Sequence, residues 1–64
     1  MMKVIMINDH IINLALVKKI YIGTGKDCIW FHFHDKDDFV CIKIDKKEVQ
    51  EIFQKCYKIM KEED

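Results

Sequence analysis

Hydrophobic and polar residues alternate through much of the first two-thirds of the chain, which is the pattern of β-strands that bury one face. It predicts strands over residues 18–23, 28–34 and 39–44. The polar loops between them, residues 24–27 and 35–38, are short enough to join antiparallel neighbours. The pattern therefore predicts a three-stranded antiparallel meander.

The N-terminal part of the chain carries shorter signals. An apolar run over residues 2–7 predicts a further strand, which a turn at residues 8–10 ends. Residues 11–13 form a short extended segment, and Asn13 is suited to cap a single helical or 3₁₀ turn over residues 14–17. The pattern leaves open how this part of the chain joins the meander.

The hydrophobic period changes from 2 to about 3.6 after Ile44, which predicts an amphipathic helix over residues 46–62. Its apolar stripe consists of Val49, Ile52, Phe53, Cys56, Tyr57 and Met60. Asp45 is the predicted N-cap, with Glu48 completing a capping box. The predicted fold is a single α+β domain over residues 1–64: an antiparallel meander of about four strands with one C-terminal helix packed on one face.

The register of the meander follows from burial, because residues opposite each other on antiparallel strands share a face. A pair of Gly23 with Cys28 closes the first hairpin, and a pair of His34 with Phe39 closes the second. This register makes one face apolar across all three strands. The apolar pairs that it predicts are Ile20–Phe31, Ile22–Ile29, Phe33–Val40, Phe31–Ile42 and Ile29–Ile44.

The opposite side of the sheet, which we call the outer face, is unusually aromatic. The same register predicts that it carries Lys19, Tyr21, Cys28, Trp30, His32, His34, Phe39, Cys41 and Lys43. Tyr21, Trp30 and Lys43 would form one row across the strands, and Lys19, His32 and Cys41 the next. A sheet face in solvent is normally polar, so this one needs an explanation.

Two explanations fit this face. The rings could stabilise a small sheet by cross-strand pairing, or they could form a contact surface for another copy of the chain or another protein. We expect the second, with the partner bound by Tyr21, Trp30, His32, His34, Phe39, Cys41 and Lys43. The expected function is that of a small protein–protein interaction module. It would be a homodimer, or an inhibitor or accessory subunit of a larger bacterial or mobile-element protein.

The alternative function is weak metal binding. His32 and His34 lie two apart on one face, and the predicted register sets Cys41 opposite His32. Three such groups could hold zinc with an open fourth position. Lys19, on the other side of His32, would disfavour a cation there. We therefore expect no metal and no cofactor.

The three cysteines are an odd number and include no CxxC spacing, which favours a reducing, cytoplasmic location, as does the lack of a signal peptide at Met1. In the predicted register Cys28 and Cys41 lie four positions apart along the strands. At about 3.3 Å per residue that is about 13 Å, beyond the reach of a disulfide. Cys56 belongs to the apolar stripe of the helix.

Charge and motifs argue against several other functions. The net charge is zero and the eleven basic residues are all lysine, whereas nucleic-acid binding favours a positive field and the arginine fork. No apolar run approaches the roughly 20 residues of a membrane span. Residues 23–26, Gly-Thr-Gly-Lys, lack the spacing of a phosphate-binding loop. There is no serine nucleophile, so we expect no enzyme.

The amino-acid composition and one resemblance indicate the kind of organism from which the chain comes. Abundant Ile and Lys without Pro, Ser or Arg indicate the AT-rich coding of a low-GC bacterium or phage. The segment from Ile12 to Leu14 followed by Val17 and Ile20, a hairpin and a final helix is similar to small bacterial sheet-plus-helix proteins, including FlbD-type flagellar proteins. The threonine and asparagine–glycine turns of that group are absent here. We infer no function from this resemblance.

Overall fold

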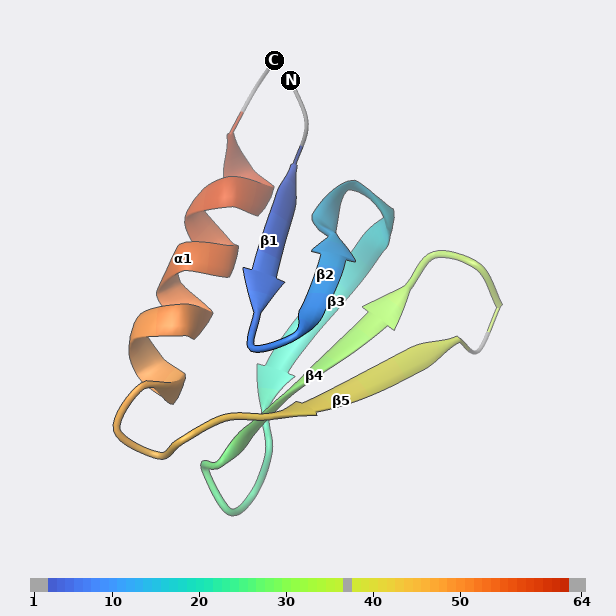
Figure 1. The fold of residues 1–64 in the computed structure, drawn as a ribbon. Coiled ribbons are helices and arrows are strands. Elements are labelled where there is room, and N and C mark those ends of the chain that lie inside the picture. Colours follow the sequence, from blue (N-terminus) through green and yellow to red (C-terminus); the bar gives the residue numbers. More distant parts are fainter. Residues whose placement is uncertain (1–2, 37, 63–64) are drawn as a thin grey trace.

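Two antiparallel sheets and one helix make up the protein, as a computed structural model shows for residues 3–36 and 38–62 (Figure 1). The elements are β1 (Val4–Ile7), β2 (His10–Asn13), the 3₁₀ turn η1 (Leu14–Leu16), β3 (Val17–Ile22), β4 (Cys28–Phe33), β5 (Phe39–Lys43) and α1 (Val49–Lys61). Strands β1 and β2 form one sheet, and β3, β4 and β5 form the other in that order. The predicted α+β fold with a C-terminal helix is confirmed.

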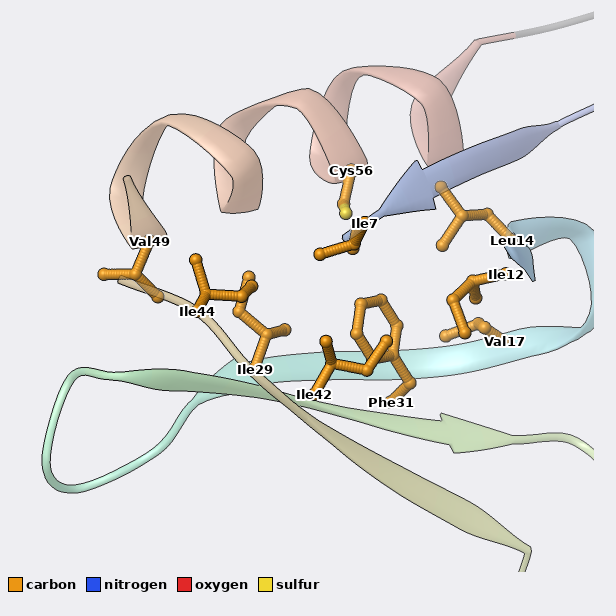
Figure 2. Close-up of a cluster of buried hydrophobic side chains, with 10 residues drawn as sticks. All are labelled: Ile7, Ile12, Leu14, Val17, Ile29, Phe31, Ile42, Ile44, Val49 and Cys56. Carbon is orange, nitrogen blue, oxygen red and sulfur yellow. The ribbon is translucent and has the colours of Figure 1, made fainter. Parts of the chain in front are cut away.

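The core lies between the three-stranded sheet and a second layer, in which α1 runs beside the β1–β2 hairpin (Figures 1 and 2). The buried hydrophobic residues are Ile7, Ile12, Leu14, Val17, Ile29, Phe31, Ile42, Ile44, Val49 and Cys56. Phe31 and Ile29 lie at the centre of the sheet and are fully buried. The β1–β2 hairpin and α1 therefore both cover the apolar face of the three-stranded sheet.

The first hairpin of the meander has the predicted register. Gly23 N donates to Cys28 O at 3.0 Å, and Ile22 lies opposite Ile29 and Ile20 opposite Phe31. The pairing slips by one residue between Val17 and Lys19, which leaves Lys18 in a bulge. The bulge lets Val17 turn its side chain into the core.

The predicted register of the second hairpin is wrong by two residues. Phe33 N donates to Asp38 O at 3.0 Å and so closes the hairpin, whereas the prediction placed His34 against Phe39. His34 lies just past the end of β4, and its N–H donates to Leu16 O at 2.9 Å on the other side of the strand. A shift of two keeps every side chain on its predicted face but changes its partners. Phe31 therefore lies opposite Val40.

The N-terminal segment forms the β1–β2 hairpin, whose pairing the sequence left open. Asn13 caps η1 as predicted, with its Oδ1 accepting from Ala15 N at 3.1 Å. The turn between the strands is made by Asn8 in the left-handed conformation, with φ of 55°. The Asn8 Nδ2 donates to Lys43 O at 3.0 Å and ties the turn to β5. Residue 2, where this strand was predicted to begin, lies outside the described residues.

The helix begins three residues later than predicted. Asp45 does not cap it directly: its Oδ1 accepts from Lys47 N at 2.9 Å and its carbonyl accepts from Glu48 N at 2.8 Å. These bonds form a separate turn that leads into α1. Glu48 occupies the N-cap position without a side-chain bond, so the predicted capping box is wrong. Aspartate satisfies the turn's own N–H groups before the helical ladder starts.

Candidate functional site

Four rings lie in contact on the outer face, on the side of the sheet away from α1. Tyr21 comes from β3, Trp30 and His32 from β4, and Phe39 from β5. The centroid of Trp30 is 6.3 Å from Tyr21 and 5.7 Å from Phe39. The centroid of His32 is 5.4 Å from Tyr21 and 5.5 Å from Phe39. The rings thus form a closed four-membered cluster, which we call the aromatic cluster.

The cluster follows from strand pairing. Tyr21 lies directly opposite Trp30, and His32 directly opposite Phe39, so each cross-strand pair contributes two rings. Such pairs stack at the separations seen here and stabilise a sheet by fractions of a kcal/mol each. One polar bond adds orientation: the Tyr21 hydroxyl lies 3.2 Å from Nε2 of His32.

The aromatic cluster is most exposed at its two sides and less exposed at its centre. Phe39 is 54% exposed and Tyr21 40%, whereas Trp30 and His32, on the central strand, are only partly exposed. Lys19 Nζ lies 5.7 Å from the Tyr21 centroid and forms part of the rim. A partner would therefore meet a largely apolar centre with charge at its edge.

The corrected register rearranges two predicted site residues. Lys43 lies opposite Cys28 rather than in the row of Trp30, and Cys41 takes that place opposite Trp30. Lys43 Nζ instead lies 3.9 Å from Oδ2 of Asp27, with its own side chain 87% exposed. An ion pair so open to water contributes little stability. Lys43 is thus a rim residue, whereas Cys41 adjoins the aromatic cluster.

His34 does not join the aromatic cluster, although the sequence placed it on the outer face. It lies past the end of β4, where its side chain lines a cleft of about 520 Å³. The cleft is lined by Leu16, Phe33, His34, Asp35 and Asp38. Leu16, 58% exposed, had no place in the predicted site. It is the last residue of η1, and its nearness to His34 depends on a tertiary contact that no local pattern encodes.

The three residues predicted as alternative metal ligands do not lie together. Phe39, not Cys41, lies opposite His32, and His34 lies beyond the strand end. In residues 3–36 and 38–62, no group of three or more His, Cys, Asp or Glu side chains is placed to hold a metal ion. The predicted set of His32, His34 and Cys41 is therefore not assembled by this fold.

The corrected register also brings two thiols closer together. Cys28 and Cys41 are two positions apart along the strands. Loss of solvation raises the pKa of Cys41 above its usual value, and the neighbouring Cys28 thiol and the charge of Asp27 raise it further. The predicted separation of four positions is therefore wrong.

The third cysteine is isolated. Cys56 is fully buried on the inner side of α1, and burial raises the pKa of its thiol to about 11. A thiol with that environment is unreactive at neutral pH and packs as a small hydrophobic side chain. Its predicted position on the buried stripe is confirmed.

A second exposed apolar pair lies on the β1–β2 hairpin. Met6 and Ile11 are directly opposite each other, and each is 71% exposed. The alternation over residues 4–13 could have revealed this pair, because Ile5 and Ile12 take the buried side. Two apolar residues at a hairpin surface are ordinary for a small protein.

Comparison with known proteins identified no relative of this chain. No model of a protein family, no curated protein and no solved structure matches the chain. Within the described part of the chain, the helix is too short and too polar to span a membrane. The chemistry of the surface is therefore the basis for a functional proposal.

Proposed function

We propose that the protein is a small protein–protein interaction module that binds its partner through the outer face, and that the partner is a second copy of the chain. The observation that carries the proposal is the aromatic cluster, an accessible group of four rings on the side of the sheet that α1 and the hairpin leave uncovered. Aromatic residues are enriched in the cores of protein interfaces.

The small size of the domain supports association. A 64-residue domain has a small stability margin, which association would increase.

The distribution of charge favours a second copy as the partner. The net charge is zero, so two copies have no overall repulsion to overcome. Lys19 and Lys43 lie at the rim of the face, and the rings lie at its centre. A twofold axis through the aromatic cluster would bury the rings against each other while the lysines stay in solvent.

Concentration dependence tests the homodimer. We expect light scattering to report a dimer, and the melting temperature to rise with protein concentration over about a hundredfold range. Trp30→Ala should dissociate the dimer, because truncating a central aromatic commonly costs about 2 kcal/mol or more of binding. Phe39→Lys should do the same by placing a charge in each half of the interface.

Two further variants separate binding from folding. Met6→Ala truncates an exposed side chain on the hairpin, so it should leave the dimer unchanged. Phe31→Ala should instead destabilise the fold by about 3–5 kcal/mol, because Phe31 is fully buried. A monomer at every concentration, with a constant melting temperature, would rule out the homodimer.

A further inference from the structure

An apolar groove lies between α1 and β3, on the inner side of the three-stranded sheet and away from the outer face. Its volume is about 320 Å³, and Figure 1 shows that α1 and β3 run in opposite directions. Tyr57 is exposed in it, and the other hydrophobic side chains are only partly buried. The groove is lined by Ile20, Phe53, Tyr57, Met60 and Lys61. A second accessible apolar surface is therefore present beside β3.

Strand β3 is an edge of its sheet, with β4 on one side only. Gly23 N donates to Cys28 O, so Gly23 and every second residue before it direct their backbone groups toward β4. The N–H and C=O groups of Ile20 and Ile22 therefore point away from β4, along the open edge. No other segment within residues 3–36 and 38–62 bonds to them. These groups can pair with a further strand.

The lysines beside the groove favour an acidic partner. Lys61 Nζ lies 5.1 Å from the centroid of Tyr57, so its ammonium group is at the wall of the groove. The last turn of α1 carries Lys58 and Lys61, against Glu62 at the C-cap. Lys18 is exposed in the bulge where β3 begins, toward the end of the groove where α1 ends. Positive charge at one end and hydrophobic side chains along the rest complement a strand with a hydrophobic residue followed by a carboxylate.

A second copy of the chain does not offer such a strand. Among the residues that the structure describes, none of the five strands contains Asp or Glu. The edge strands β3 and β5 instead contain Lys18, Lys19 and Lys43, so pairing β3 with either would bring lysines together. The complementary segment therefore belongs to a different protein.

We propose that β3 and the groove bind an extended segment of another protein, which adds to the sheet as a strand antiparallel to β3. A hydrophobic side chain opposite Ile20 enters the groove, because opposed residues share a face. An acidic side chain two residues later reaches Lys61, since two residues of strand span about 7 Å and the helix rises about 6 Å from Tyr57 to Lys61. In this mode of recognition main-chain bonds give affinity and side-chain pockets give specificity.

A short capped peptide of threonines with one Ile and, two residues later, one Glu tests the site. We expect isothermal titration calorimetry to show saturable binding of one peptide per chain. N-methylation of the Ile should weaken binding by about 10-fold or more, because it removes the N–H that bonds to Ile20 O. N-methylation of the next residue should leave binding nearly unchanged, because that N–H faces away from β3.

An exchange of charge tests the end of the groove. Lys61→Glu should weaken binding of this peptide by about 5- to 20-fold and should favour a peptide with Lys in place of Glu. Lys55→Glu is the matched control, because Lys55 lies on the β1 side of α1 and should leave the preference between the two peptides unchanged. Circular dichroism checks that both variants keep the fold.

The titration is repeated with Phe39→Lys, in which the proposed homodimer is absent, and we expect the same affinity. The docking site and the homodimer can therefore fail separately. The proposal is wrong if the peptide does not bind at about 1 mM, or if the two N-methyl peptides bind equally well. It is also wrong if Lys61→Glu and Lys55→Glu have the same peptide preference. If the peptide dissociates a dimer that Phe39→Lys leaves intact, β3 pairs with a second copy instead.

Discussion

The Tyr21 hydroxyl lies 3.2 Å from Nε2 of His32, and the two rings stack with their centroids 5.4 Å apart. The two residues are on neighbouring strands and two pairs apart in register, so the bond crosses the sheet diagonally. It joins the Tyr21–Trp30 pair to the His32–Phe39 pair and makes the aromatic cluster one unit.

Tyr21→Phe should therefore destabilise the fold modestly. The ring and its stacking remain, and only the hydrogen bond is lost, which is worth about 0.5–1.5 kcal/mol. Urea unfolding measures the difference at a protein concentration where association is complete. Tyr57→Phe is the control, because Tyr57 is 53% exposed on α1 and belongs to no such pair. Equal losses for both variants would contradict a structural role for the bond.

Gly23→Ala should destabilise the protein by about 1–3 kcal/mol, in the range of overpacked sites. The added methyl group would collide with Cys28 Sγ and lie 3.3 Å from Nε1 of Trp30. Gly25→Ala should be nearly neutral, since the atoms that its Cβ would meet belong to the partly exposed end of the Asp27 side chain, with Oδ1 nearest at 3.0 Å. Adding Cys28→Ala to Gly23→Ala should recover much of the loss, and a strictly additive double variant would contradict this explanation.

Asn8 has two roles that substitutions can separate. Its φ of 55° favours Gly or Asn, and its Nδ2 donates to Lys43 O. Asn8→Gly keeps the backbone and loses the bond, so it should cost about 1 kcal/mol. Asn8→Ala loses the bond and adds about 1–2 kcal/mol of left-handed strain. Chemical denaturation should rank the two in that order, and equal losses would mean that strain is absent.

The start of the helix gives a direct comparison of Asp45 with Glu48. Asp45→Ala removes the bond to Lys47 N and should cost about 0.5–2 kcal/mol, as for capping residues in general. Glu48→Ala should change stability by less than about 0.5 kcal/mol, because its side chain makes no capping bond. If Glu48→Ala were the more damaging of the two, the capping box predicted from the sequence would hold after all.

Alkaline pH should weaken the fold through Cys56. Its pKa is about 11 in the folded protein and near 9.0 in an exposed thiol, so between these values the unfolded chain has released a proton that the folded chain retains. Stability conferred by this group is fully present below pH 9 and falls as the pH rises toward 11. Thermal melts over this range should show a shallower decline for Cys56→Ala than for the unmodified protein.

Sequence periodicity determined much of this fold. A period of 2 identified the three long strands and a period near 3.6 identified α1, because strands and helices repeat side-chain direction at those intervals. The same alternation assigned Phe31 and Ile29 to the core and Trp30 and Tyr21 to the outer face. The turn at Asn13 was predictable too, since an asparagine side chain satisfies the free N–H groups of a starting turn.

Tertiary structure alone decided the partners within each face. Alternation distinguishes odd from even shifts of register, so a shift of two residues in the second hairpin leaves every burial assignment intact. The actual hairpin closes with the bond from Phe33 N to Asp38 O, which places Phe39 rather than Cys41 opposite His32. Register sets which side chains meet, whereas the pattern of hydrophobicity sets only which side they face.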